Sequence, residues 1–194
     1  MDTIHGDPTP IPPTLEKNVR VVFYTADFPL KWADCSHTAD FLSQFFTGVL
    51  APHRTAAQVT DLTHSIGYLA NELIENAVKF RADGDVTIEA GLDGADFILR
   101  IANNVALETS ERFQPLLREL TAGDPGDLLI QRIEANAIAG GSGSGLGILT
   151  LMNDYGVRIT WRFASADGAV FLETVARLTL PETSATYAKP HHGN

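Results

Sequence analysis

Cysteine is almost absent from the sequence, which has one, Cys35, among 194 residues. A single cysteine excludes an internal disulfide. Long apolar runs are missing as well, and none approaches the roughly 18 residues expected of a membrane-spanning helix. Residues 1–13 lack the basic and apolar regions of a signal peptide. Together these absences predict a cytoplasmic protein without a membrane span.

Positive charge is scarce too. The chain has 14 lysines and arginines against 24 aspartates and glutamates, and its formal net charge is −10. An acidic surface repels a phosphate backbone, so nucleic-acid binding is not expected. The six histidines do not cluster at the spacing of metal ligands, and we assign a metal to none of them.

The patterns that are present predict one α/β domain, because 194 residues suffice for one core and are few for two. Residues 1–18, rich in proline and turn formers, are expected to form a flexible arm, and residues 181–194 a flexible tail. Between them, in the domain at 19–180, strands are expected at 19–25, 86–90, 96–102, 158–163 and 169–180, and helices at 36–50, 55–81, 109–120, 125–138 and from the glycine-rich stretch to about 155. This order predicts a two-layer α/β sandwich, in which a mixed β-sheet carries helices on one face.

Residues 71–80, Asn-Glu-Leu-Ile-Glu-Asn-Ala-Val-Lys-Phe, combine acidic, amide and basic side chains within one expected helix. At helical spacing, Glu72, Asn76 and either Glu75 or Lys79 fall within one turn along a single face. An amide oxygen at Asn76 suits a Mg²⁺ ion that also binds substrate phosphates, Glu72 suits a general base, and Lys79 suits a phosphate contact. The alternative is a solvent-facing helix surface with a Glu75–Lys79 ion pair. The two asparagines of the segment, poor helix formers, favour the functional interpretation.

A glycine-rich stretch at 140–147 is the second candidate. It ends in five residues that precede an apolar run: Gly143, Ser144, Gly145, Leu146 and Gly147. Glycine lets the backbone approach a ligand closely, and a loop that leads into a helix offers unpaired N–H groups to phosphate. A flexible hinge is the alternative. The stretch is neither a Walker A loop nor a dinucleotide-binding fingerprint, because no Gly-Lys-Ser/Thr follows and it lies late in the chain.

The two motifs together resemble those of the histidine-kinase-like (GHKL, Bergerat-fold) ATPase superfamily, which includes gyrase, histidine kinases, mismatch-repair ATPases and anti-sigma-factor serine kinases. Residues 72–80 are similar to its N-box and residues 143–148 to its second glycine box. The resemblance implies a Bergerat fold that binds ATP with Mg²⁺. It also implies that Glu72 activates the nucleophile, that Asn76 binds the metal and that Lys79 contacts phosphate, while the second glycine box closes over the triphosphate.

One departure concerns the family's adenine box, which lies between these motifs. Residues 101–107 read Ile-Ala-Asn-Asn-Val-Ala-Leu, so Asn103 stands in the place of the adenine-binding aspartate and Val105 in that of the first glycine. An amide oxygen accepts a hydrogen bond less strongly than a carboxylate. Nucleotide binding is therefore expected to be weakened, altered in base preference or lost.

The departure points to a subgroup. Residues 69–77, 101–105 and 144–156 resemble small bacterial regulators, similar to the kinases that phosphorylate a STAS-like partner of the anti-sigma-factor-antagonist type. That resemblance extends over about residues 19–180 and implies a Mg²⁺-dependent Ser/Thr protein kinase.

Four further expectations accompany the resemblance. A non-catalytic or nucleotide-gated partner-binding module is the alternative that the altered adenine box suggests. A sensor histidine kinase is not expected, because no phosphoacceptor helix pair precedes Glu72. Residues 106–142 would form a lid over the nucleotide. The resemblance allows a homodimer, although no surplus apolar stripe argues for one.

Overall fold

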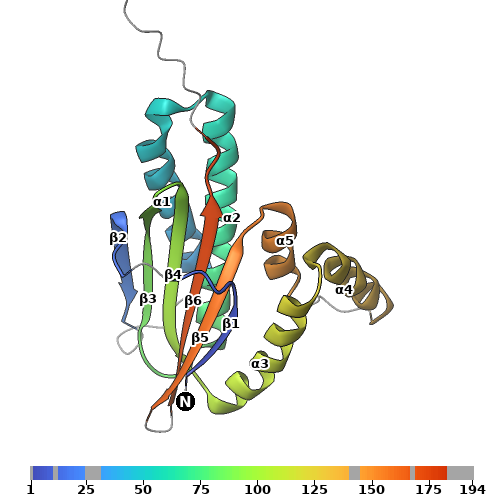
Figure 1. Ribbon diagram of the computed structural model, residues 1–194. Coiled ribbons are helices and arrows are strands. Elements are labelled where there is room, and N and C mark those ends of the chain that lie inside the picture. The colour runs from blue at the N-terminus through green and yellow to red at the C-terminus, as the bar shows by residue number, and fades with distance from the viewer. Residues whose placement is uncertain (1, 11–12, 25–31, 140–144, 167–168, 183–194) are drawn as a thin grey trace, which may run out of the picture.

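A single antiparallel sheet and five α-helices make up the fold in the computed structural model, which describes residues 2–10, 13–24, 32–139, 145–166 and 169–182. The elements are β1 (Thr3–Gly6), β2 (Glu16–Phe23), α1 (Trp32–Leu50), the 3₁₀ turn η1 (Ala51–His53), α2 (Ala56–Phe80), β3 (Val86–Asp93), β4 (Asp96–Val105), α3 (Leu107–Ala122), α4 (Pro125–Ala139), α5 (Leu146–Asp154), β5 (Arg158–Ala166) and β6 (Ala169–Thr179). The strand order is β1-β5-β6-β4-β3-β2 (Figure 1). No helix within the described ranges has the length and apolarity that a membrane span requires.

The direction of the strands differs from the expectation. All five neighbouring pairs are antiparallel, so the prediction of a mixed sheet is wrong. Two of the pairs, β3–β4 and β5–β6, are hairpins and are antiparallel by connection. Between β2 and β3 the chain forms α1 and α2, which pack together. Helix α2 runs in the direction opposite to α1, so the chain returns to the end of the sheet at which β2 finished. Strand β3 starts there and is therefore antiparallel to β2. The broader prediction, an α/β sandwich of one sheet and a helical layer, is confirmed.

Helix α2 begins at a capping box and carries the core on one face. Thr55 accepts a hydrogen bond from the main-chain N–H of Gln58, whose side chain accepts one from the main-chain N–H of Thr55. Its buried residues repeat every three or four positions: Leu62, Ile66, Leu69, Ala70, Leu73, Ile74 and Val78. The same core includes Phe46 of α1 and Phe97 of β4, whose rings meet edge to face with centroids 5.0 Å apart. This packing holds α2, and any functional group on it, rigidly over the sheet.

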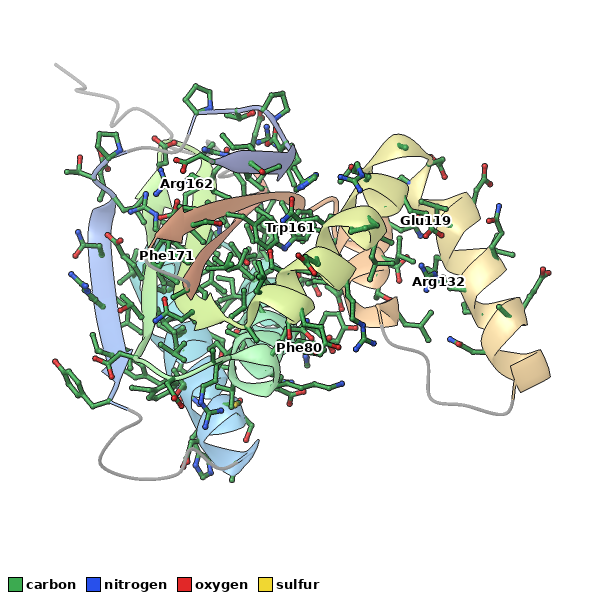
Figure 2. All side chains as sticks on the ribbon, turned by 90° about the horizontal axis from the view of Figure 1, so that it is seen from below. Phe80, Glu119, Arg132, Trp161, Arg162 and Phe171 are labelled. Carbon is green, nitrogen blue, oxygen red and sulfur yellow. The ribbon has the colours of Figure 1, made fainter. Side chains whose placement is uncertain are left out.

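Helices α3 and α4 extend to one side of the sheet, as Figure 2 shows. The guanidinium of Arg132 on α4 lies 3.3 Å from a carboxylate oxygen of Glu119 on α3. Helix α4 also packs against α5, and α3 packs against β1 and β6. The segment expected to form the lid is therefore helical in most of its described part, and its first helix, α3, packs against the sheet.

The N-terminal arm does not match its expectation. Residues 3–6 form β1, which pairs with β5 at one edge of the sheet, whereas β2 lies at the opposite edge. The connecting residues 7–10 and 13–15, here called the N-terminal strap, contact the sheet between these edges. Thr160 donates a hydrogen bond to the main-chain oxygen of Asp7 at 2.7 Å, and Arg177 donates one to that of Pro10 at 3.0 Å. Two main-chain carbonyl groups of this proline-rich stretch thus hold its described residues to the sheet.

Leu15 anchors the strap and provides a test of it. Its side chain is 5% exposed and packs with Ile98 and Val175 on the face of the sheet that the helices leave open. We expect Leu15→Ala to lower the free energy of unfolding by about 2 kcal/mol, measured by urea denaturation, because buried apolar contacts are lost. Ile4→Ala, at a side chain that is 62% exposed, is the control and should stay within about 0.5 kcal/mol of the wild type. Equal stability of both variants would mean that the strap is not docked.

Candidate functional site

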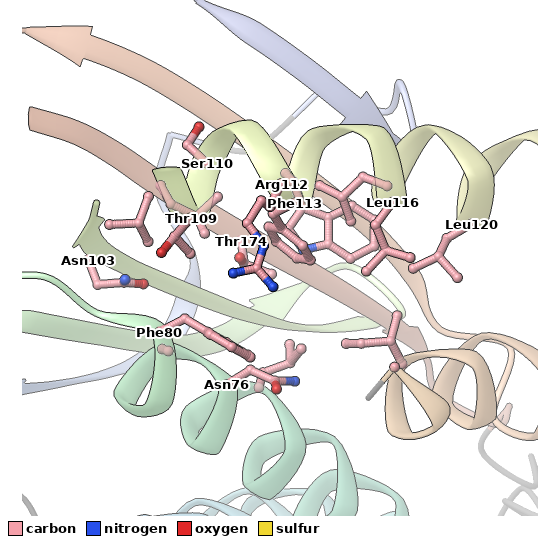
Figure 3. Close-up of a pocket in the computed structure, with 18 of the residues that line it drawn as sticks. Asn76, Phe80, Asn103, Thr109, Ser110, Arg112, Phe113, Leu116, Leu120 and Thr174 are labelled. Carbon is pink, nitrogen blue, oxygen red and sulfur yellow. The ribbon is translucent and has the colours of Figure 1, made fainter. Parts of the chain in front are cut away.

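A cavity of about 300 Å³ lies between α2, the inner face of the sheet, α3 and the first turn of α5 (Figure 3). Its wall is mainly apolar, formed by Leu73, Ala77, Phe80, Val105, Phe113, Leu116, Leu117, Leu120, Ile148, Trp161 and Leu172. Polar atoms come from Glu72, Asn76, Asn103, Thr109, Ser110, Arg112 and Thr174, and from the backbone at Gly145 and Gly147. A mainly apolar cavity with a few convergent polar groups is typical of a small-molecule site.

The structure brings together five of the candidate residues from three separate parts of the chain. Glu72 and Asn76 come from α2, Asn103 comes from β4, and Gly145 and Gly147 come from the start of α5. Two further candidates, at 143 and 144, lie outside the described residues. Leu146 is half-buried and is not among the residues that line the cavity. Segments about 30 and 70 residues apart therefore meet at one cavity, as the two motifs require.

Lys79 lies elsewhere. Its side chain is exposed, and its Nζ lies 5.0 Å from the centroid of the Phe80 ring at the end of α2. An ammonium group keeps its hydration when its stem lies along an apolar surface, which accounts for this position. The Glu75–Lys79 ion pair of the alternative interpretation is also missing from the described part of the chain, where Glu75 instead accepts a hydrogen bond from Asn71 at 2.9 Å.

The carboxylate of Glu72 packs against the first turn of α5. A β-carbon built on Gly147 would overlap this carboxylate, so the helix can approach Glu72 only because residue 147 has no side chain. Burial raises the pKa of Glu72 by removing water, the neighbouring Glu75 raises it further by repulsion, and a hydrogen bond with Tyr68 opposes the shift. A carboxyl group with a raised pKa inside a cavity has the properties of a general base.

Asn103 is 3% exposed and belongs to the inner face of β4. Its amide nitrogen donates a hydrogen bond to the main-chain oxygen of Asn104 at 3.0 Å. In Figure 3 its carbonyl oxygen points into the cavity, toward Thr109. The next residue on this face, Val105, is buried and forms apolar wall. Asn103 thus places an amide acceptor beside an apolar surface.

Sequence reasoning missed the polar residues that α3 and β6 contribute. Thr109, Ser110 and Arg112 lie on one side of the cavity, and Thr174 lies on its floor (Figure 3). Helix α3 is held over the cavity by Phe113, whose ring meets those of Trp161 and Phe163 edge to face with centroids 6.5 and 6.2 Å away. The strand alternation of 169–180 could have pointed to Thr174, because it shares its face with buried residues. No local pattern distinguishes Arg112 from the other charged residues of α3.

The described residues offer few side chains that could together hold a metal ion. Among the residues described, no group of three or more His, Cys, Asp or Glu side chains is arranged to hold a metal ion. A metal would therefore depend on few protein ligands and on its substrate or water.

No protein-family model matches the chain, and no curated protein matches it either. The function must therefore be argued from the geometry of the cavity.

Proposed function

We propose that the cavity binds ATP with Mg²⁺ and that the protein is a regulatory Ser/Thr kinase of a small STAS-like partner protein. The observation that carries the proposal is the convergence of Glu72, Asn76, Asn103 and the glycine-bounded start of α5 on one cavity. These are the residues on which the resemblance to GHKL ATPases rests. Three independent segments that meet at one cavity are stronger support than any one motif.

The two ends of the cavity differ in the ligand groups they suit. The buried amide of Asn103 and the apolar surface around Val105 suit the amino group and ring of a base. The first turn of α5 suits phosphate, because its N–H groups have no partner within the helix and the positive end of the helix dipole lies there. Gly145, which precedes this helix, has a φ of 95°, a conformation that favours glycine. A nucleoside phosphate has both chemistries.

Asn76 supplies the donor that fits a Mg²⁺ ion. Its side chain lines the cavity one helical turn after Glu72. Mg²⁺ binds oxygen, retains several waters and is commonly held by one or two protein groups together with substrate phosphates. The absence of a multidentate acidic cluster in the described residues agrees with such a site. When bound, the ion would supply neutralisation of phosphate charge, and Asn76 would hold it.

Glu72 would act on the partner's hydroxyl group. The carboxylate accepts the proton of the serine or threonine hydroxyl while the hydroxyl oxygen forms a bond to the γ-phosphorus of ATP. The bond from that phosphorus to the bridging oxygen breaks, and ADP leaves with the electron pair. The raised pKa of Glu72 assists this step, because a carboxylate that holds its proton more tightly is a stronger base.

Calorimetric titration of ATP in the presence of Mg²⁺ tests the binding site. We expect micromolar affinity for the wild type and at least tenfold weaker binding for Asn76→Ala, because the protein ligand of the ion is removed. Asn71→Ala is the matched control on the same helix, since Asn71 is not among the lining residues and bonds to Glu75. Absence of binding by the wild type at millimolar ATP would exclude the proposed function.

A partner-binding module without phosphoryl transfer is the second candidate. The residues that favour it are Asn103 and Val105, which replace an acidic acceptor and a flexible glycine of the family's adenine box. Two results together would favour the module over the kinase. The protein would bind ATP without transferring phosphate to its partner, and its affinity for the partner would change when ATP is bound.

A further inference from the structure

The cavity carries negative charge that would repel a phosphate ligand. Glu72 contributes an anionic carboxylate beside the start of α5, and Glu75 lies close enough to raise its pKa further. ATP would bring additional negative charge to the same cavity. A helix N-terminus offsets only about half of one charge. A cationic side chain is therefore needed besides the metal.

Arg112 is the one cationic side chain among the lining residues that the structure describes. It lies on the second turn of α3, on the opposite side of the cavity from α2. Figure 3 shows its guanidinium directed into the space between α3 and α2, toward Phe80 and Asn76. Lys79, the cation that the sequence motif favours, lies against Phe80 and does not line the cavity.

The side chain of Arg112 is available to a ligand. It pairs with Glu108, four residues earlier, at 4.0 Å, and the side chains of Arg112 and Glu108 are 82% and 85% exposed. An ion pair that long and that exposed contributes little to stability, so exchanging Glu108 for a ligand phosphate costs little. A guanidinium also presents several N–H donors in a planar fork that matches phosphate oxygens, whereas an ammonium acts as a point charge.

We propose that Arg112 is the phosphate-recognition residue of this cavity and that it makes the site selective for nucleoside phosphates over nucleosides. This inference rests on the proposed ATP site.

The test compares ATP, ADP and adenosine as ligands of four proteins by calorimetry in Mg²⁺ buffer. The proteins are the wild type, Arg112→Gln, Arg112→Lys and Arg118→Gln, the last a matched control because Arg118 is an exposed residue of the same helix outside the cavity. We expect Arg112→Gln to weaken ATP binding by about tenfold to a hundredfold and to leave adenosine binding within twofold. Arg112→Lys should recover part of the loss, and the ATP affinity of Arg112→Gln should depend less on salt than that of the wild type.

The outcomes separate the inference from the proposed function. If the wild type binds no ATP, the proposed function fails and the inference fails with it. If the wild type binds ATP and Arg112→Gln binds it equally well, the inference is overturned while the ATP site stands. An equal loss of adenosine and ATP would show a structural role for Arg112 and would also overturn it. Lys79→Met is measured as a fifth protein, and a greater loss of ATP affinity in it than in Arg112→Gln would assign the phosphates to Lys79 instead.

Discussion

Gly147→Ala is expected to retain the fold and to lose about a hundredfold in affinity for ATP. The added β-carbon would overlap the Glu72 carboxylate, which is the end of a flexible side chain and can turn away. The backbone of α5 therefore need not move. The displaced carboxylate and the new methyl group would then occupy the space through which phosphate reaches the first turn of the helix.

Gly48→Ala is the matched control for this variant. Gly48 is exposed within α1, and a β-carbon there meets nothing within 4 Å. Alanine should stabilise the helix by up to about 1 kcal/mol and leave ATP binding unchanged. Thermal denaturation and calorimetry of both variants make the comparison. Unchanged ATP affinity in Gly147→Ala would show that the start of α5 is not part of the nucleotide site.

Glu72→Gln is expected to raise stability and abolish transfer at the same time. The pKa of Glu72 is raised above its ordinary value of 4.5, so the folded state binds this proton more tightly than the unfolded chain does. The resulting contribution to stability is present at low pH and is lost as the pH rises through the folded-state pKa. At neutral pH the ionised carboxylate destabilises the fold, and an uncharged amide of the same size removes that penalty. The gain in stability should vanish as the pH falls below 4.5.

The same substitution removes the proposed base. The rate of phosphoryl transfer from γ-labelled ATP, to a STAS-like partner or to water, should fall by about a hundredfold to ten-thousandfold. Glu75→Gln, on the same helix but outside the lining of the cavity, should change that rate by no more than a few fold. A Glu72→Gln protein that is less stable than the wild type at pH 7 would contradict the assigned environment, and one that transfers phosphate normally would contradict the assigned role.

Local signals made most of the fold predictable. Helix α2 was predicted at 55–81 and found at Ala56–Phe80, because its capping residue and its apolar repeat both lie within the segment itself. The hairpin of β3 and β4 was predictable for the same reason, since a turn at 92–95 stands between the strands expected at 86–90 and 96–102. Strand β1 was missed because its partner β5 lies about 150 residues further along the chain. Pairing at such separation leaves no pattern in the strand.

The candidate site divides in the same way. Glu72 and Asn76 are one helical turn apart, so periodicity alone places them together, whereas Asn103 and the start of α5 were expected beside them only from the resemblance to GHKL motifs. The position of Lys79 depended on whether its long side chain turned toward the cavity or toward Phe80, which spacing cannot decide. Arg112 enters through the packing of α3 on Trp161 and Phe163, a tertiary contact. Sequence patterns therefore could not identify the site residues whose positions depend on how α3 packs.

The pairing of β1 with β5 has a consequence for how the chain acquires its structure during synthesis. Strand β1 cannot take its place at the sheet edge until residues 158–166, which are synthesised later, have left the ribosome. The strap likewise lacks its hydrogen-bond donors until Thr160 and Arg177 have been synthesised. Contacts of such sequence separation slow folding, so closing the sheet at β1 should be the last step of folding.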